Sequence, residues 1–568
     1  MKEEVVKLLK KILEQKGVKL DSKEIEGYIE VPPSAEMGDY AFPCFFLAGK
    51  LKDNPAKIAA ELRKEIKIIP KGFSEIKVAG PYVNFYTDKN SFAEKTISDI
   101  LIKKNNFGKN SLGKNIKTMI EFSQPNTHKA FHVGHIRGTS IGESLSRISE
   151  FSGEKIIRAN YSGDTGMHIA KWIWCYNKYH SKEKLKDDEA WIASIYVDAV
   201  KKLSENPDFQ KEVDEINKKL ESRADKKINE LWKKTRILSI KSWNKIYKEL
   251  NTRFDVHFFE SEVEKRGKEL VADLIKKGVA EKSQGAIIVD LNKYDLGVFI
   301  LLRSDGTVLY SSKDLALAEK KLKEYKLDKS IVVVGSAQDF YFKQLFKVIE
   351  IAKLCKEGVL NHIPFSEIRL PAGKMSSRTG ENIIYSDFMS EMLDYSKKEI
   401  LKRAPKLPKK ELERRAIKIS VSAIKYSILK QNSNKSITFR KEDTLNFDGD
   451  TGPYILYSYA RACSILKKVK AGTKQTKKII KNLEQKEIEL VRKLSQFPEI
   501  VISSYQTLNP SSLANYSYQL SQIFNEFYHD CPVIGSENES FRLSLVKSFK
   551  QVLRNSLYLL GIETVERM

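Results

Sequence analysis

The chain has 568 residues, of which 41% are hydrophobic and 30% are charged. This composition is typical of globular proteins, and no apolar run approaches the roughly 18 residues that a membrane span requires. The 99 Lys and Arg residues outnumber the 74 Asp and Glu residues, and the net charge of +25 favours a polyanionic partner as much as it does simple solubility.

The N-terminal part of the chain, residues 1–113, is predicted to be a small α+β domain. Helical periodicity covers 55–66, and β-prone runs follow at 76–78 and 82–86. Helices and strands mixed over this length favour the α+β class. The polar run 103–110 is predicted to be a linker.

Residues 114–387 are predicted to form a parallel-sheet domain. A β-prone run at 118–122 is followed by a helix at 134–150 and by a second β-prone run at 155–159. A strand, a helix and a strand within about 45 residues make a βαβ unit, and this unit implies a parallel sheet.

Charged, helix-forming sequence fills residues 172–282 and predicts a helical insertion in this domain. The β-prone runs return at 285–291, 299–303 and 330–334, with helical stretches between them. Residues 388–568 show helical periodicity to the end and are predicted to be all-α. The predicted fold class is therefore α/β: a Rossmann-like sheet domain with an insertion, an N-terminal α+β domain and a C-terminal helical domain.

The five cysteines are widely spaced and include no C-x-x-C pair. This pattern argues against a disulfide framework and against a thiolate zinc site, so we expect no zinc and a reducing, cytoplasmic compartment. The first residues lack the apolar core of a secretory signal, which agrees with that location.

The first motif that points to chemistry is His132-Val133-Gly134-His135, between a predicted strand and a helix N-terminus. Free N–H groups and the helix dipole attract anions there, and Gly134 allows a ring or a phosphate to approach closely. An imidazole N–H can donate to phosphate oxygens as charge develops on them. Alone, the pair would more simply be two structural histidines. A zinc pair is disfavoured because no Glu stands between them and no Cys is near.

The second motif, residues 374–378, reads Lys-Met-Ser-Ser-Arg in a Gly-bounded polar loop. Lys374 supplies a point charge for phosphate, and the hydroxyls of Ser376 and Ser377 can donate to its oxygens. By itself such a string is typical of a solvated basic turn. The combination with the histidine motif is more specific.

The two motifs resemble the ATP-site motifs of class I aminoacyl-tRNA synthetases. Finer matches indicate the arginyl-tRNA synthetases of the archaeal type, over nearly the whole chain and most weakly across the insertion. The stretches that carry the resemblance are 38–43, 121–126, 160–166, 302–307, 333–339, 451–454 and 560–563. Many members of that family lack the first lysine of the second motif and rely on one upstream of the histidines. This chain has both Lys129 and Lys374, so which of them meets the phosphates stays open.

The resemblance implies an arginine–tRNA ligase that works as a cytoplasmic monomer, with ATP and Mg²⁺, L-arginine and tRNA(Arg) as its substrates and partners and no zinc. Arginine is first activated to an adenylate with release of pyrophosphate and then transferred to the 3′-terminal adenosine, and members of the family generally need bound tRNA for the first step. The implied catalytic and ATP-binding residues are Lys129, His132, Gly134, His135, Lys374, Met375, Ser376 and Ser377. Neither step needs a protein nucleophile, so catalysis rests on positioning and on charge neutralisation.

The family resemblance also implies an arginine pocket. Its residues are Glu121, Asn126, Tyr310, Asp314 and Gln338. Acids, amides and a phenol suit a guanidinium, which offers five planar donors. Taken without the family, Asp314 is explained by its place near a helix start, and Tyr310 by a strand.

Two sets of residues match family positions that contact tRNA. Tyr82 and Asn84 correspond to contacts with the tRNA elbow. Tyr454, Tyr457 and Arg461 lie in the helical domain, where aromatic rings can stack on anticodon bases. The alternatives are a buried strand for the first set and an aromatic stripe in a helix core for the second.

Two other functions are open to the same motifs. A class I synthetase for glutamate, cysteine or lysine is one, although an acidic pocket disfavours glutamate and scattered cysteines disfavour the zinc-bearing cysteine enzyme. A non-catalytic RNA-binding relative is the other. It would keep the basic surface but has no need of His132, His135 or Lys374, all of which are present.

Overall fold

The computed structural model describes residues 1–32, 34–304, 309–369, 384–469 and 482–568. The chain forms two compact units. One consists of residues 108–464, 496–522 and 553–568, and the other of residues 1–107, 465–495 and 523–552. In the part of the chain described, no helix is both long enough and apolar enough to cross a membrane.

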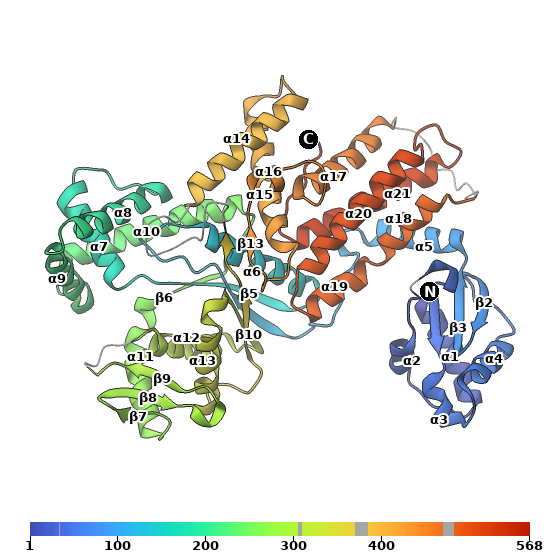
Figure 1. The fold of residues 1–568 in the computed structure, drawn as a ribbon, viewed down its shortest axis with the longest axis horizontal. Helices are drawn as coiled ribbons and strands as arrows, with labels where there is room; N and C mark the ends of the chain where they lie inside the picture. The colour runs from blue at the N-terminus through green and yellow to red at the C-terminus, as the bar shows by residue number, and fades with distance from the viewer. Residues whose placement is uncertain (33, 305–308, 370–383, 470–481) are drawn as a thin grey trace. The chain divides into compact units, whose positions relative to one another are not determined.

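A five-stranded parallel sheet forms the centre of the first unit (Figure 1). Its strands are β4 (Lys117–Glu121), β5 (Lys155–Ser162), β6 (Val256–Phe259), β10 (Lys329–Gly335) and β11 (Leu360–Phe365). Their order is β11-β10-β4-β5-β6. The chain runs from β4 to one side of the sheet through β5 and β6, and returns to the other side through β10 and β11. The gap between β4 and β10 is therefore a topological switch point, where sheets of this kind bind ligands at the carboxyl ends of their strands. The predicted parallel-sheet fold is confirmed.

Helix α6 (Val133–Phe151) connects β4 to β5 and packs closely on the sheet. Gly142 makes this approach possible, because a Cβ at that position would lie 2.2 Å from Cγ of Phe122. Strand β10 is buried over nearly its whole length, as expected for a parallel sheet with both faces covered.

The insertion between β5 and β6 is helical, as predicted, but it is shorter than the predicted 172–282. It consists of α7 (Met167–Cys175), a π-helical turn (Tyr176–His180), α8 (Glu189–Glu205), α9 (Phe209–Ser222) and α10 (Lys226–Glu249), which gather on one side in Figure 1. Sequence reasoning missed β6, which lies inside the stretch predicted to be helical. Its four residues are flanked by long charged helices, so no β periodicity stands out.

Two predicted strands lie outside the parallel sheet, and one strand of that sheet was not predicted. The runs at 285–291 and 299–303 are strands, but they belong to a separate antiparallel sheet of β7 (Glu281–Ser283), β8 (Ala286–Asp290) and β9 (Val298–Leu302). Strand β11 was not predicted. It contains Asn361 and Pro364, and an edge position tolerates a proline that a central strand excludes. Helices α11 (Glu260–Lys276), α12 (Tyr310–Tyr325) and α13 (Asp339–Ile351) complete the sheet region.

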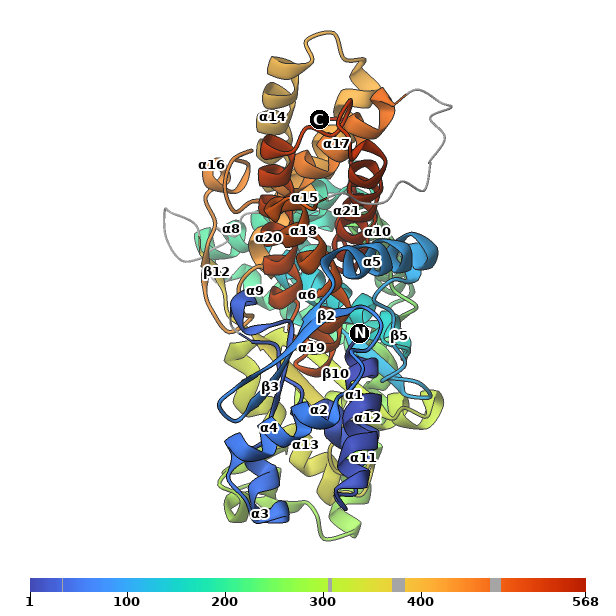
Figure 2. The same ribbon diagram turned by 90° about the vertical axis from the view of Figure 1, so that its right-hand side faces the viewer.

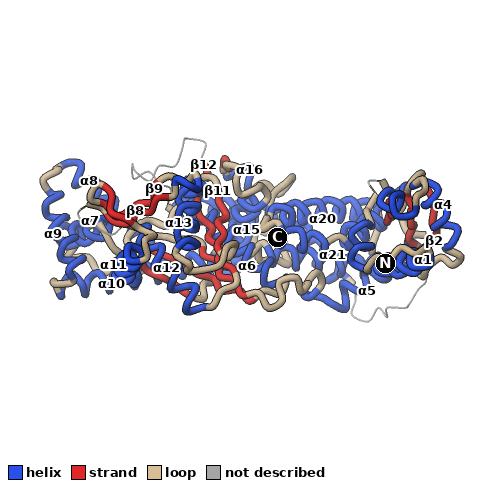
Figure 3. The backbone as a smooth tube through the Cα atoms, turned by 90° about the horizontal axis from the view of Figure 1, so that it is seen from below, coloured by secondary structure: helices blue, strands red, loops and turns tan. Residues whose placement is uncertain are grey.

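The C-terminal part is helical as predicted. Its helices are α14 (Tyr385–Arg403), α15 (Lys409–Leu429), α16 (Lys441–Thr444), α17 (Gly452–Lys468), α18 (Gln485–Ser495), α19 (Phe497–Gln506), α20 (Ser511–Asp530) and α21 (Glu539–Leu559). Figure 3 shows α20 and α21 as long helices. One detail departs from an all-α description, because the two-residue strand β13 (Ile437–Thr438) pairs with β12 (Ile368–Arg369) of the sheet region.

The N-terminal residues form the predicted α+β arrangement (Figure 2). Its elements are α1 (Lys2–Gln15), α2 (Ser22–Tyr28), β1 (Tyr40–Pro43), α3 (Ala48–Leu51), α4 (Pro55–Glu65), β2 (Phe73–Ala79), β3 (Tyr82–Thr87) and α5 (Lys89–Lys103). The strands form an antiparallel sheet in the order β1-β3-β2. Local sequence explains the start of α4, where Asn54 caps the helix and Pro55 occupies its first position.

Candidate active site

The loop between β4 and α6 carries the histidine motif and is conformationally strained. Ser123, Gln124 and His128 adopt left-handed backbone conformations, with φ of 80°, 51° and 63°. Such conformations cost about 1–3 kcal/mol each for residues other than glycine and gather at functional sites. The surrounding structure must therefore hold this loop in place.

Contacts to the β5–α7 turn and to α10 supply that support. Asn126 Oδ1 accepts a hydrogen bond of 3.1 Å from the Gly163 N–H, and the Thr127 N–H donates to the Gly163 carbonyl at 3.0 Å. His128 Nε2 lies 2.6 Å from Thr235 Oγ1, and Ser123 Oγ lies 2.9 Å from the Tyr247 hydroxyl, both on α10. The helical insertion thus helps to shape the loop.

His132 and His135 cap the N-terminus of α6 reciprocally. Nδ1 of His132 accepts a bond of 3.1 Å from the Gly134 N–H, and Nδ1 of His135 accepts one of 3.1 Å from the His132 N–H. The two rings lie 3.8 Å apart, centroid to centroid. Because each Nδ1 is an acceptor, these bonds place the proton of each neutral ring on Nε2.

Burial keeps both rings neutral. It lowers the pKa of His132 to about 4, with a further contribution from Lys129. It also lowers the pKa of His135 well below its usual value, with contributions from His132 and Lys129. At neutral pH the pair therefore offers two Nε2–H donors without a full positive charge.

Lys129 supplies a cation beside the histidines. Burial lowers its pKa, and repulsion from Lys171 lowers it further. The ammonium group lies 5.5 Å from the ring centroid of Tyr196 and forms no ion pair with the described residues. A partly buried ammonium without a carboxylate partner is suited to an anionic ligand.

The second motif, with Lys374, Met375, Ser376 and Ser377, lies outside the described residues. The chain that follows it is anchored on the histidine loop. Ile384 forms an antiparallel bridge with His132, and the Tyr385 N–H donates to the Phe131 carbonyl at 2.7 Å. Glu189 of α8 accepts from both the Phe131 N–H and the Ser386 hydroxyl, each at 2.9 Å.

All five residues of the predicted arginine pocket line one cavity of about 290 Å³. Glu121 ends β4 and Asn126 follows in the loop, Tyr310 and Asp314 lie in the first turns of α12, and Gln338 follows β10. Tyr310 begins a helix, so the alternative explanation that it belongs to a strand does not hold. The cavity sits at the switch point between β4 and β10.

Among the described residues, three carboxylates line the cavity, and two of them pair with a lysine. Glu121 forms an ion pair with Lys321, both nearly fully buried, and Glu260 pairs with Lys313 at 2.9 Å. Asp314 instead accepts a hydrogen bond of 2.5 Å from the Tyr341 hydroxyl. Burial raises the pKa of Asp314 to about 7, and the negative charges of Glu121 and Glu260 act in the same direction. A guanidinium in this cavity therefore meets one carboxylate, that of Asp314, for which the described part of the chain supplies no ion pair.

Sequence reasoning missed several residues of this cavity. They are Gln124, Tyr161, Glu260 and Lys321, with Lys313 and Tyr341 as contacts of the acidic groups. Glu260 directly follows β6, so its carboxylate would have been a candidate if that strand had been recognised. Lys321 carries no signal of its own, because one lysine on a charged helix looks like a surface residue.

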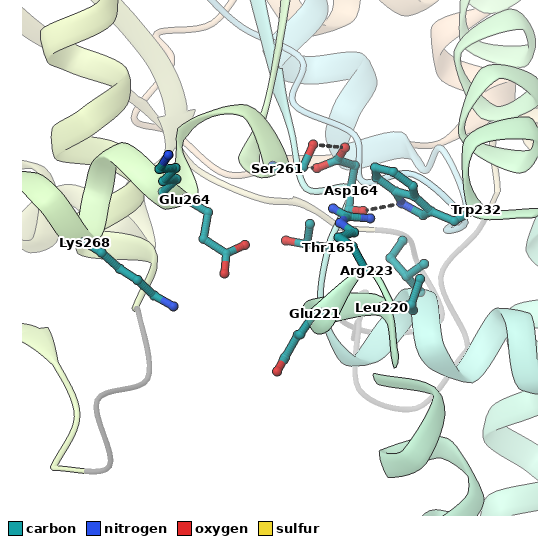
Figure 4. A pocket seen from close by; sticks show the side chains of 12 residues that line it. Asp164, Thr165, Leu220, Glu221, Arg223, Trp232, Ser261, Glu264 and Lys268 are labelled. Carbon is teal, nitrogen blue, oxygen red and sulfur yellow. Dashed lines mark hydrogen bonds between the residues drawn. The ribbon is translucent and has the colours of Figure 1, made fainter. Parts of the chain in front are cut away.

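A second cavity, of about 250 Å³, is lined by the β5–α7 turn together with residues of α9, α10 and α11 (Figure 4). Asp164 connects the turn to α10 and α11. Its carboxylate accepts from the Ser261 hydroxyl at 2.6 Å and from Arg236 at 2.7 Å, and its carbonyl accepts from the Trp232 indole N–H at 2.8 Å. Because Gly163 precedes it and bonds Asn126, Asp164 stabilises the wall of the first cavity.

The predicted tRNA-contacting residues have different environments. Asn84 is buried on β3, and Tyr82 is half-buried, with its ring 5.6 Å from that of Phe45. On α17, Tyr457 is exposed and the Arg461 guanidinium lies 4.8 Å over its ring. Tyr454 is half-buried and packs 5.6 Å from Tyr518.

Comparison with known proteins gives matches over the whole length. The family described as "tRNA synthetases class I (R), catalytic domain" matches residues 96–440. The families described as "DALR anticodon binding domain" and "Arginyl tRNA synthetase N terminal domain" match residues 455–568 and 1–87.

Individual relatives agree with these matches. An "Arginine--tRNA ligase" from Clostridium perfringens is 37% identical over 558 residues, which cover 97% of this chain and 98% of that protein. One from Clostridioides difficile is 36% identical over 562 residues, covering 98% of each. Among solved structures, the arginyl-tRNA synthetase of Thermus thermophilus has a TM-score of 0.79 at 23% identity, covering 99% of both chains. That of Plasmodium falciparum has a TM-score of 0.77 at 25% identity, covering 100% of this chain and 99% of that one.

The fold and the histidine motif at the switch point define a class I aminoacyl-tRNA synthetase. Within that class, the chain belongs to the arginyl-tRNA synthetase family, and the predicted enzymatic activity, arginine–tRNA ligase, is confirmed. The relatives above that match in sequence are bacterial, so the archaeal affiliation predicted from the sequence finds no support.

Proposed function

We propose that the two sites described above act together in arginine activation, with ATP phosphates at the start of α6 and arginine in the cavity at the switch point. The observation that carries this proposal is their continuity. Asn126 lines the cavity and lies on the same short loop that ends at His132.

In the first step, an oxygen of the arginine carboxylate attacks the α-phosphorus of ATP, and the bond to pyrophosphate breaks. Negative charge grows on the phosphate oxygens, and the Nε2–H groups of His132 and His135 donate to it together with the N-terminus of α6 and Lys129. ATP enters as its Mg²⁺ complex, in which the ion is bound mainly by phosphate oxygens.

Lys374, Ser376 and Ser377, together with the backbone at Met375, act on the same phosphates in this proposal. Support comes from the anchoring of Ile384 beside His132. The ten residues from Lys374 to Ile384 (384 − 374) span at most about 36 Å when fully extended, so the motif is within reach of the histidines. Lys129 and Lys374 share the pyrophosphate charge.

Arginine is recognised by charge and by acceptor geometry. Asp314 ionises when the guanidinium arrives and forms the charge-assisted contact, and Glu121 adds a second acidic group. The amide oxygens of Asn126 and Gln338 and the hydroxyl of Tyr310 complete the set of acceptors. Glutamate would meet carboxylates here without a free cation, which disfavours that alternative substrate.

The other parts of the chain serve tRNA(Arg). In this proposal, the catalytic domain covers 114–387 with its helical insertion between β5 and β6, and residues 1–113 contact the tRNA elbow through Tyr82, with buried Asn84 on the same strand. Residues 388–568 read the anticodon, with Tyr454, Tyr457 and Arg461 as stacking and phosphate contacts.

In the second step, the 3′-terminal ribose hydroxyl of the tRNA attacks the adenylate carbonyl and releases AMP. The enzyme acts as a cytoplasmic monomer.

Pyrophosphate exchange measured with each amino acid, in the presence of total tRNA, tests the substrate assignment. Exchange is expected with arginine, and exchange with another amino acid but not with arginine would contradict it. The variant His135→Ala tests the site assignment. It should lose adenylate formation and still bind tRNA(Arg), and undiminished charging by this variant would remove His135 from the mechanism.

A further inference from the structure

A thiol, an imidazole and a carboxylate come together in the helical insertion, away from the cavities described above. Cys175 ends α7, His180 ends the π-helical turn that follows, and Asp198 lies on α8. His180 Nε2 lies 3.1 Å from Asp198 Oδ2, and Cys175 Sγ lies 3.5 Å from the same oxygen. One potential ligand atom from each residue lies within 4.8 Å of the other two.

The π-helical turn explains how Cys175 and His180 reach the same partner. Five residues apart in an α-helix, two side chains point about 140° away from each other, because each residue advances the helix by about 100°. A π-helix has a wider turn with i→i+5 bonds, which returns the fifth residue to the same side. Such turns are rare and are found frequently at functional sites. Residues 176–180 adopt this conformation, and both side chains contact Asp198.

A further carboxylate fixes the imidazole ring. Nδ1 of His180 lies 2.6 Å from Glu183 Oε1, and Glu183 Oε2 accepts a bond of 2.8 Å from the Trp191 indole N–H. A carboxylate that holds one ring nitrogen while the other faces a shared centre is the arrangement that orients histidine ligands in metal sites.

We propose that Cys175, His180 and Asp198 bind one divalent transition-metal ion, and that Zn²⁺ is the ion this ligand set favours. Thiolate, imidazole and carboxylate are its three common protein ligands, whereas Mg²⁺ and Ca²⁺ prefer oxygen alone. A tetrahedral ion with metal–ligand bonds of about 2.0–2.3 Å separates its ligand atoms by roughly 3.3–3.7 Å. The observed separations of 3.1 and 3.5 Å are close to this range.

The site has a route for the ion and a place for a fourth ligand. The side chains of His180 and Asp198 are 22% and 29% exposed, whereas Cys175 is buried. The ion therefore enters from the side of His180 and Asp198, and a water molecule completes its coordination. On binding, the proton of the Cys175 thiol and the proton on Nε2 of His180, which faces Asp198, leave to solvent. The proton on Nδ1 stays beside Glu183.

The lack of closely spaced cysteine pairs predicted no zinc. Here the spacing is Cys-x4-His, and the third ligand comes from another helix, 18 residues further on (198 − 180). The ion would fasten α7 to α8 inside the insertion. The inference does not depend on the proposed roles of the catalytic residues.

Cobalt binding to the full-length chain tests the proposal, because Co²⁺ bound to a thiolate gives a strong charge-transfer absorption. The chain is first freed of metal with a chelator and then titrated with Co²⁺. We expect one equivalent to bind, with that absorption, and one equivalent of Zn²⁺ to displace it. The variant Cys175→Ser should lose the absorption, and Glu183→Gln should weaken Zn²⁺ binding by about 10- to 100-fold through loss of ring orientation.

The variant Cys355→Ser is the matched control, since Cys355 is a free cysteine outside the cluster. It should bind Co²⁺ like the unaltered chain. Failure of the unaltered chain to bind a stoichiometric ion would overturn the proposal, and so would a thiolate absorption that survives in Cys175→Ser or disappears in Cys355→Ser. Should Cys175→Ser not fold, Asp198→Asn replaces it, and Zn²⁺ affinity unchanged in both Asp198→Asn and Glu183→Gln contradicts the site. None of these measurements uses aminoacylation, so they test the metal site independently of the proposed catalytic function.

Discussion

The substitution Gly134→Ala separates the placement of the histidine pair from the stability of its helix. A Cβ at position 134 would lie 2.9 Å from Cε1 and 3.0 Å from Nδ1 of His132, which is too close for any side chain. The His132 ring must therefore rotate away, and it loses the bond of 3.1 Å from the Gly134 N–H.

The effects on stability and on catalysis differ in size. Loss of the cap lowers the free energy of unfolding by about 0.5–2 kcal/mol, whereas alanine in place of a helical glycine raises it by about 0.5–1 kcal/mol. The net change in the free energy of unfolding should therefore stay within about 1.5 kcal/mol. By contrast, displacing one transition-state donor costs about 2.7–4 kcal/mol, which is a loss of about a hundred- to a thousandfold in rate.

The assay is arginine-dependent pyrophosphate exchange in the presence of tRNA, together with thermal unfolding. We expect Gly134→Ala to lose about two to three orders of magnitude in exchange with little change in the unfolding temperature. Gly27→Ala is the control, because Gly27 lies in a helix with nothing within 4 Å of an added Cβ. Exchange by Gly134→Ala within about threefold of the unaltered chain, a difference of under about 1 kcal/mol in the barrier, would contradict this role of the His132 ring.

Three further predictions concern the same cavity and its surroundings. Because Asp314 is protonated below its pKa of about 7 and a guanidinium needs it ionised, the KM for arginine should rise by up to about tenfold per pH unit as the pH falls below 7, and Asp314→Asn should flatten this profile in steady-state kinetics. Lys129→Met and Lys374→Met should each slow pyrophosphate exchange, and a normal rate in either one would assign the phosphates to the other lysine. Lys321→Met should destabilise the chain by about 3–5 kcal/mol, measured by denaturant unfolding, because it leaves the Glu121 carboxylate buried without its partner. Equal stability of Lys321→Met and the unaltered chain would contradict this prediction.

Much of the sheet was predictable from local sequence. Strands β4, β5 and β10 were predicted as β-prone runs next to helices with clear periodicity, and the βαβ pattern predicts that they are parallel. Their order, with β10 beside β4 rather than beyond β5, does not follow from that pattern. Strand β6 was missed because its four residues lie among long charged helices. Strand β11 was missed because its proline is tolerated only at an edge, and a sequence does not reveal which strand lies at the edge.

The candidate site was predictable only in part. Glu121, Asn126 and His132 were predicted together because they lie in one stretch that resembles the extended first motif of the family. Glu260 and Lys321 come from segments about 140 and 200 residues further on, and only the parallel order of the strands brings them to the same cavity. The protonation of Asp314 depends on the charges of Glu121 and Glu260 across that cavity, so no local pattern encodes it.

A buried network of charges holds the later turns of α6. Glu143 on α6 pairs with Arg147 at 2.6 Å and with Arg158 of β5 at 3.1 Å. Arg158 also holds Glu150 through two bonds of 2.6 and 2.9 Å. Buried charges are tolerated only when each has its partners, so any displacement of α6 along the sheet would leave a charge unpaired at a cost of several kcal/mol.

The C-terminal residues of the chain close this network. Arg147 donates to the Tyr558 carbonyl at 3.0 Å, Ser144 donates to the Leu559 carbonyl at 2.9 Å, and buried Lys425 donates to the Gly561 carbonyl at 3.0 Å. Preorganised donors contribute most to catalysis when they do not have to reorganise during the reaction. The same helix that presents His132 and His135 at its first turn is thus fixed, through its later turns, by charges and carbonyls from the end of the chain. The buried ions around α6 thus fix a helix whose first-turn histidines are neutral.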